Sequence, residues 1–180
     1  GGPFHPPYRS RDGHPAHDGT LRDEVVAKMR AAFGERFGLC GSGWGSDVEP
    51  VPLARSHEVY WRSRIGLSVS LDNSLECYTS DRLFRILGCG ALLLVKRFSG
   101  MEVLGLRHDE NCLVFESAEQ AVALAKSAIF SLIDGDGEDM RRAVQRIVAA
   151  GALLARERHT WSARMRELVP YIEVVRGARK

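Results

Sequence analysis

The sequence lacks a long hydrophobic run and a large net charge. No apolar stretch approaches the roughly 20 residues that a helix needs to span a bilayer, so we expect no membrane-spanning segment. The 25 basic residues nearly balance the 23 acidic ones and leave a formal charge of +2. Because a nucleic-acid-binding domain is expected to carry a clustered basic face, we expect no nucleic-acid partner. Lysine is scarce, so arginine, which binds anions through a planar fork, supplies most of the positive charge.

Signals for metal binding and for export are missing as well. The cysteines are Cys40, Cys77, Cys89 and Cys112. They form no C-x-x-C pair, so we expect no zinc site and interpret them as buried free thiols of a reducing compartment, the cytoplasm. The N-terminus shows no basic segment followed by an apolar one, so no signal peptide is expected. The segment DGDGED begins like a calcium loop, but Gln145 stands where the twelfth position needs glutamate.

Proline, glycine and the spacing of apolar residues divide the chain into elements. Residues 1–19 are rich in proline and glycine and are expected to form a loop. Helical spacing predicts helices over residues 21–33, 53–64, 81–88, 118–133, 138–158 and 161–169, with Pro170 ending the last one. Short apolar runs predict strands over residues 36–40, 65–71, 91–95 and 111–115. Because strands alternate with helices, we expect an α/β fold with a Rossmann-like, doubly wound, mainly parallel sheet.

The segment DGDGED, residues 134–139, is the best candidate for a hinge. We interpret residues 1–133 as a Rossmann-like domain and residues 134–180 as C-terminal helices that pack on the same domain. Two caps support the helices on either side of the hinge. Ser117 and Gln120 form a capping-box pattern, and Thr160 is placed to cap the last helix.

The glycine cluster GSGWGS, residues 41–46, departs from a dinucleotide-binding fingerprint at two points. Its third glycine position holds Ser46, and the following residues, DVEPVP, cannot form the helix whose N-terminus would bind a pyrophosphate. A nicotinamide-dependent oxidoreductase is therefore not expected. The loop can still lie against a ligand, because glycine lets the backbone approach closely; the alternative is a plain turn.

The segment TSDRLFRILGCG, residues 79–90, predicts an anion site. In an open α/β sheet, ligands bind beyond the carboxyl ends of the strands, and the strand over residues 65–71 leads towards this helix. The first N–H groups of the helix would face a phosphate, with Arg82 and Arg85 as forked donors. The alternative is that Ser80 only caps the helix and that both arginines lie on a solvated face.

The first loop, which contains FHPPYRSRDGHPAHDG, offers two kinds of ligand. Its histidines and aspartates are spaced too loosely for a metal site, so we expect no bound metal. Arg9 and Arg11 are candidates for a clamp on a diphosphate.

An ordered series of segments runs from about residue 34 to residue 168. They are FGLCGSGW, SRIGLSVS, TSDRLFRILGCGALLLV, GMEVLGLRHDENCLVF, SAEQAVALAKSAI and AAGALLARERHTWSARMREL. This series resembles the C-terminal domain of GT-B glycosyltransferases, within glycosyl transferases group 1 and nearest to the spore-maturation glycosyltransferase-like group. The family's closing pattern, His-Thr-aromatic-x-x-Arg, corresponds here to residues 159–164.

The resemblance implies a hexosyltransferase-like glycosyltransferase. This half would bind a nucleotide-diphosphate sugar, commonly a UDP- or GDP-sugar, and a missing N-terminal GT-B domain would bind an acceptor that the sequence does not identify. No metal or other cofactor is implied, because positive groups and helix N-termini stabilise the departing diphosphate.

The resemblance also implies which residues contact the donor. Near the base it places Gly41, Ser42, Gly43, Trp44 and Val51, and along the diphosphate and ribose it places Tyr78, Thr79, Ser80, Asp81 and Arg82. Many GT-B enzymes carry a Glu-x7-Glu pattern, whose second glutamate falls here at Arg85 and whose first falls at Cys77, one place from Glu76. The alternative is therefore a non-catalytic nucleotide-binding or scaffolding module with a degenerate site.

Overall fold

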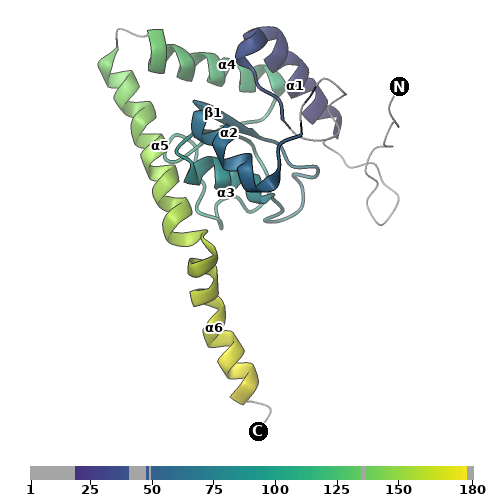
Figure 1. Ribbon diagram of the computed structural model, residues 1–180, viewed down its shortest axis with the longest axis vertical. Helices are drawn as coiled ribbons and strands as arrows, with labels where there is room; N and C mark the ends of the chain where they lie inside the picture. Colours follow the sequence, from purple (N-terminus) through teal and green to yellow (C-terminus); the bar gives the residue numbers. More distant parts are fainter. Residues whose placement is uncertain (1–18, 41–47, 49, 135–136, 178–180) are drawn as a thin grey trace.

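The computed structural model describes residues 19–40, 48, 50–134 and 137–177, and Figure 1 shows their arrangement. The helices are α1 (Gly19–Phe33), α2 (Ser56–Arg62), α3 (Asp81–Gly88), α4 (Ala118–Ile129), α5 (Glu138–Arg158) and α6 (Trp161–Gly177). The strands are β1 (Ile65–Ser68), β2 (Leu92–Lys96) and β3 (Leu113–Phe115). Short helical turns are η1 (Gly34–Arg36), η2 (Leu53–Arg55) and the π-helical η3 (Phe130–Asp134).

The strands form a parallel sheet in the order β1-β2-β3. Ile65 of β1 lies opposite Leu92 of β2, and Leu94 of β2 lies opposite Leu113 of β3. Parallel neighbours need long crossovers, which α3 and the loop of residues 97–112 provide. The central strand β2 is buried for most of its length, as expected for a strand covered on both faces. The predicted α/β, Rossmann-like fold with a parallel sheet is confirmed.

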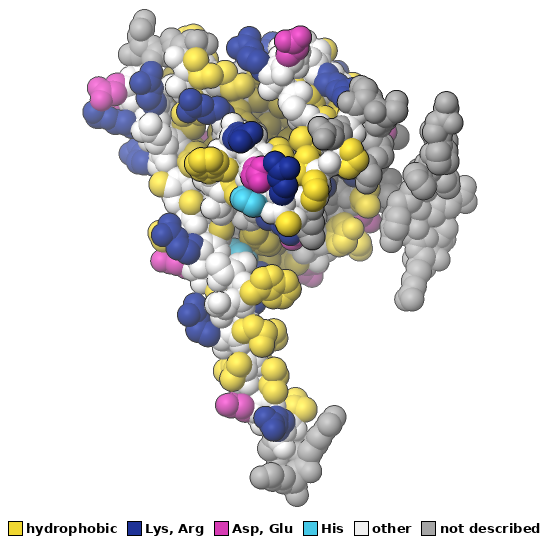
Figure 2. All heavy atoms as spheres, viewed as in Figure 1, with side chains coloured by type: hydrophobic (Ala, Val, Ile, Leu, Met, Phe, Trp, Pro, Cys, Tyr) yellow, Lys and Arg dark blue, Asp and Glu magenta, His cyan; other side chains and the backbone are white. Residues whose placement is uncertain are grey.

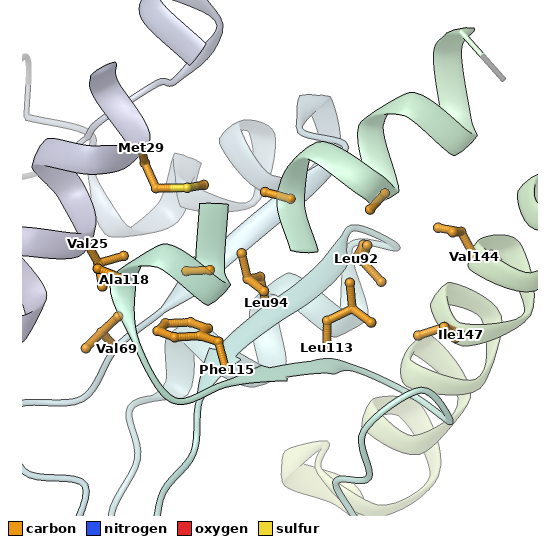
Figure 3. Packing of buried hydrophobic residues seen from close by; sticks show 13 residues of the cluster. Val25, Met29, Val69, Leu92, Leu94, Leu113, Phe115, Ala118, Val144 and Ile147 are labelled. Atoms are coloured by element: carbon orange, nitrogen blue, oxygen red, sulfur yellow. The ribbon is translucent and has the colours of Figure 1, made fainter. Parts of the chain in front are cut away.

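The sheet buries a different hydrophobic cluster on each face. Alternate side chains of β2 point to opposite faces, so Leu92 and Leu94 belong to one cluster and Leu93 and Val95 to the other. Helices α1, α4 and the first half of α5 cover the first cluster, and Figure 3 shows Met29 of α1 on this side of the sheet. Helix α3 covers the second cluster. The helices therefore hold the sheet between two layers.

Helix α5 runs beside the sheet and joins both clusters (Figure 1). Ile147 belongs to the first cluster and Ala155 to the second. The helix comes closest at Gly151, where an added Cβ atom would lie 2.7 Å from the carbonyl oxygen of Asn111 and 2.7 Å from the side chain of Leu87. Glycine permits this approach because it has no side chain. The packing of α5 against α3 depends on it.

Helix α6 projects from the rest of the molecule as an arm (Figure 1). Among its described side chains, only Ala163 is buried. Pro170 lies inside the helix, so the prediction that it ends the helix is wrong. Proline removes one N–H donor, but on an exposed arm water can bind the carbonyl that loses its partner. Figure 2 shows hydrophobic side chains along the arm, and those with a four-three spacing are Trp161, Met165, Leu168, Ile172 and Val175.

None of the helices in the described ranges is both long and apolar enough to cross a membrane.

The strand predicted over residues 36–40 is absent from the described part of the chain. After α1, Gly34 adopts a φ of +54° and accepts a hydrogen bond of 3.0 Å from the N–H of Phe37, so the chain turns sharply. Residues 37–40 then lie along a cleft beside β1 and form no ladder with it. Phe37 packs against the first cluster instead, which accounts for the apolar residue that suggested a strand.

The cysteines are free, as predicted, but only one of them is buried. Burial raises the pKa of the Cys112 thiol to about 12. Cys77 and Cys89 are half-buried and Cys40 is exposed. Apolar neighbours in the sequence suggested burial for more of them, but Cys77 and Cys89 flank α3 in loops at its two ends, where solvent still reaches them.

Candidate functional site

A cleft of about 540 Å³ opens beside β1, on the edge that faces away from β2. Helices α1, α2 and α4 and residues 36–40 form its other walls. Apolar side chains that include Met29, Leu67 and Ile129 line its interior. The cleft opens along this edge because no described residue pairs with it.

Arginine dominates the charge of the cleft. The described residues that line it include Arg22, Arg36, Arg62, Arg64 and Arg82. No aspartate or glutamate stands among those lining residues. A concave site with one sign of charge and an apolar interior concentrates ions of the opposite sign, so the cleft favours anions.

The start of α3 meets the cleft beyond the carboxyl end of β1. Ser80 has an extended backbone at the N-cap position, but its hydroxyl makes no capping hydrogen bond. The N–H of Leu83 donates a hydrogen bond of 3.2 Å to the carbonyl oxygen of Ser80. Among the described residues of this turn, the N–H groups of Asp81 and Arg82 are therefore the ones left for another acceptor. Arg82, in this first turn, lines the cleft and forms no ion pair with any residue that the structure describes. A helix N-terminus beside a guanidinium group is suited to a phosphate.

Arg22 and Tyr60 reach the same end of the cleft. Burial lowers the pKa of Arg22, and the charge of Arg82 lowers it further, so the two guanidinium groups lie near each other. Burial raises the pKa of Tyr60, while the charges of Arg82 and Arg85 oppose this rise. Two neighbouring guanidinium groups and a neutral phenol hydroxyl form a site with several donors for phosphate oxygens.

Arg85 lies behind the wall of the cleft and connects two helices. Its guanidinium donates a hydrogen bond of 2.6 Å to the hydroxyl of Ser56 and forms an ion pair of 2.8 Å with Asp81. Ser56 lines the cleft at the start of α2. The arginine that replaces the expected glutamate therefore fixes α2 to α3.

The loop before α3 is bound to the loop after β2. Cys77, whose φ is +56°, donates a backbone hydrogen bond of 2.7 Å to Ser99, and Ser99 donates one of 2.9 Å to Asn73. The hydroxyl of Thr79 is buried in this loop and has no hydrogen-bond partner in the described part of the chain. An unpaired buried hydroxyl costs about 1–3 kcal/mol, and Thr79 lies outside the lining of the cleft.

The structure brings some of the predicted site residues to the cleft and leaves others outside it. Val51 and Arg82 line the cleft. The predicted residues that are described but absent from its lining are Glu76, Tyr78, Thr79, Ser80, Asp81 and Arg85. Cys40 lines the cleft directly before the glycine cluster. The predicted residues that lie outside the described ranges are Arg9, Arg11, Gly41, Ser42, Gly43 and Trp44.

The sequence interpretation missed Arg22 and Tyr60. Arg22 was counted only as part of the helix that begins near residue 21, and Tyr60 only as part of the helix over residues 53–64. Apolar spacing says which face of a helix is buried, but it does not say which other helix comes to lie beside it. The one sequence signal was the general excess of arginine over lysine.

Comparison with known families agrees with this geometry. A family model described as glycosyl transferase-like matches residues 22–170, which include most of the cleft and the start of α6. No curated protein matches the chain significantly. Because the match covers far more than half of the sequence, the chain belongs to the glycosyl transferase-like family.

Proposed function

We propose that this chain is the donor-binding half of a glycosyltransferase and that it binds a UDP- or GDP-sugar. Membership of the glycosyl transferase-like family supports a sugar-transfer reaction. The acceptor, whose identity stays open, would bind to an N-terminal GT-B domain outside this sequence. Residues 1–133 would form the nucleotide-sugar-binding domain and residues 134–180 the helices that pack on it. The free thiols support a location in a reducing compartment such as the cytoplasm.

The observation that carries this proposal is the position of Arg82. It stands in the first turn of α3, lines a cleft without acidic residues among its described lining, and forms no ion pair with a described residue. The donor diphosphate would accept hydrogen bonds from Arg82, Arg22 and the first N–H groups of α3. On the basis of the resemblance, Tyr78, Thr79, Ser80 and Asp81 would lie beside the diphosphate.

The same groups would assist bond breaking. When the bond between the anomeric carbon and the β-phosphate oxygen breaks, negative charge grows on the leaving nucleoside diphosphate. Fixed guanidinium groups and helix N–H groups stabilise such charge without reorganising, which lowers the barrier. The glycosyl group forms its new bond to the acceptor, and we assign no catalytic base to this chain. Arg9, Arg11, the loop Gly41–Trp44 and Val51 remain proposed donor contacts on the basis of the resemblance.

Calorimetric titration with UDP, GDP and their sugars tests the proposal. We expect binding that Arg82→Gln weakens by about tenfold or more, because a hydrogen bond to a charged group contributes about 1.5–3 kcal/mol. Arg62→Gln is the matched control, since Arg62 lines the same cleft near the start of β1. Equal losses in both variants would contradict a specific phosphate contact and indicate a diffuse electrostatic effect.

One observation favours the alternative of a non-catalytic scaffolding module. Arg85 stands where the family pattern places a ribose-binding glutamate, and its ion pair with Asp81 occupies the nearest carboxylate. A module of this kind would give no heat with any nucleotide or nucleotide sugar in the same titration. Binding of a nucleotide sugar that depends on Arg82 would instead support the donor site.

A further inference from the structure

His159, at the junction of α5 and α6, contacts three separate parts of the molecule. Its ring stacks on Phe84 of α3, with ring centroids 4.0 Å apart and an angle of 18° between the planes. Its Nε2 atom lies 2.8 Å from the carbonyl oxygen of Leu104, and its Nδ1 atom lies 2.8 Å from the guanidinium of Arg164. One side chain thus connects α3, the loop after β2 and the first turn of α6.

The chemistry of these partners requires a neutral ring. A carbonyl oxygen only accepts hydrogen bonds, so Nε2 must carry a proton and donate it to Leu104. A guanidinium group only donates, so Nδ1 of His159 must accept from Arg164 and carry no proton. Only the neutral Nε2–H tautomer satisfies both contacts. An imidazolium ring would direct an N–H group, and a positive charge, at the guanidinium of Arg164.

The charged groups around the ring add to this preference. Burial lowers the pKa of His159, and the charges of Arg164 and Arg158 lower it further, whereas the Leu104 carbonyl and the charge of Glu167 act in the opposite direction. Glu167 lies on α6 and pairs with Arg164 at 3.7 Å, so it partly neutralises that arginine. Helix α3 contributes the uncharged ring of Phe84, so it offers no compensating anion.

Few other contacts hold α6 in place. Ala163 is the one buried side chain among those described in the helix. Thr160 caps the helix by accepting a hydrogen bond of 3.1 Å from the N–H of Ala163, but this bond is internal to the start of the arm. The contacts of His159 and the burial of Ala163 therefore determine where α6 points relative to the body, which we define as residues 19–158.

We infer that His159 is a proton-sensitive joint, which holds α6 in one direction while its ring is neutral and releases the arm when the ring is protonated. The proton comes from solvent and binds to Nδ1, and the hydrogen bond from Arg164 breaks. The Nε2–H bond to Leu104 remains, so the loop side of the joint stays in place. The direction of an arm that exposes Trp161, Leu168 and Ile172 thereby becomes dependent on pH.

Nuclear magnetic resonance of the whole chain tests both parts of this inference. Side-chain ¹⁵N shifts report the tautomer of His159, and residual dipolar couplings of α5 and α6 amides report the direction of the arm relative to the body. We expect the Nε2–H tautomer and one common alignment at about pH 7.5, and α6 couplings reduced towards zero at the acidic pH where the same ¹⁵N shifts show the ring to be protonated. An Nδ1–H tautomer, or α6 couplings that stay unchanged while the ring titrates, would overturn the inference.

Substitutions separate the joint from a general effect of acid. In Arg164→Gln the side-chain amide can donate to neutral Nδ1 or accept from protonated Nδ1, so α6 should keep its direction at both pH values. In His159→Phe the stack on Phe84 can remain but both hydrogen bonds are lost, so the couplings should be reduced at both pH values. His57→Gln alters an exposed histidine on α2 and should respond like the unmodified chain. A pH response that persists in either of the first two variants would also overturn the inference.

Discussion

Helices α3 and α6 each begin after a residue with a hydroxyl group, but the molecule stabilises them in opposite ways. Leu83, Ile86 and Leu87 bury one face of α3, while Ser80 leaves its N-terminus without a side-chain cap. Thr160 caps α6 with a hydrogen bond, while nearly all of that helix stays exposed. The comparison teaches that tertiary burial frees the N-terminus of α3 for a ligand, whereas α6 depends on its cap and its joint.

The largest expected effect tests the difference in burial. Leu83→Ala removes a side chain that is fully buried in α3, and we expect it to lower the free energy of unfolding by about 2–5 kcal/mol. Leu168→Ala makes the same change on α6, where the side chain is 50% exposed, and should change stability by less than about 0.5 kcal/mol. Urea denaturation of both variants measures the difference. A large loss in Leu168→Ala would mean that the arm is covered in solution and would break the comparison.

A smaller effect tests the two caps. Thr160→Ala removes the hydroxyl that accepts from the N–H of Ala163, and we expect it to cost about 0.5–2 kcal/mol, the usual range for loss of an N-cap. Ser80→Ala should leave thermal and urea stability nearly unchanged, because the hydroxyl of Ser80 makes no capping bond. A loss of equal size in Ser80→Ala would show that α3 is capped after all, and would weaken the argument that its N–H groups are left for a phosphate.

The same two helices show how far the sequence predicts the fold. The apolar positions of α3 predicted its bounds and its buried face, because local spacing and burial agree there. Pro170 misled the interpretation of α6, since local preference favours a stop where an exposed helix in fact continues. Phe37 misled in the same way, because an apolar side chain can serve the core from a turn as well as from a strand. Local patterns fail where a residue's role depends on distant partners.

Some residues of the candidate site were predictable from the sequence and others were not, for the same reason. Arg82 could be proposed from the sequence, because a helix that follows a strand places its first turn at the ligand edge of a sheet. Arg22 could not, because it reaches the cleft only through the packing of α1 against α4 and the first cluster, which brings it near Arg82. The sequence also left the role of Arg85 open. In the structure its guanidinium binds the hydroxyl of Ser56 and the carboxylate of Asp81. A residue can be predicted when its place in its own helix or strand decides its role. It cannot be predicted when its role depends on which other helix packs beside it.

A still smaller effect is the pH dependence of stability through His159. Its pKa in the folded chain is lowered from 6.5, mainly by burial, so the unfolded chain binds more protons between the folded and unfolded pKa values. Stability from this group is therefore fully present above about pH 6.5 and declines as the pH falls towards the folded pKa. Urea midpoints from neutral to mildly acidic pH should show this decline, and His159→Gln should reduce it.

The control for this measurement is His57→Gln on α2. Its exposed side chain lies outside the joint, so this substitution should leave the decline unchanged. Parallel pH profiles for the unmodified chain and His159→Gln would contradict the assignment. The proton sensitivity of the molecule would then lie outside His159, and the joint would lose its thermodynamic support.

The smallest expected effect concerns metal ions at α3. Arg22, Arg82 and uncapped helix N–H groups already provide positive charge for a diphosphate, so nucleotide affinity should be the same with a chelator and with excess Mg²⁺. Among the described residues, no group of three His, Cys, Asp or Glu side chains is placed to hold a metal ion. Calorimetric titration of UDP under both conditions measures the effect. An increase in affinity of about tenfold with Mg²⁺ would mean that the ion shares the diphosphate with the arginines. The free N-terminus of α3 would then be insufficient by itself, and its contrast with the capped N-terminus of α6 would no longer explain where the ligand binds.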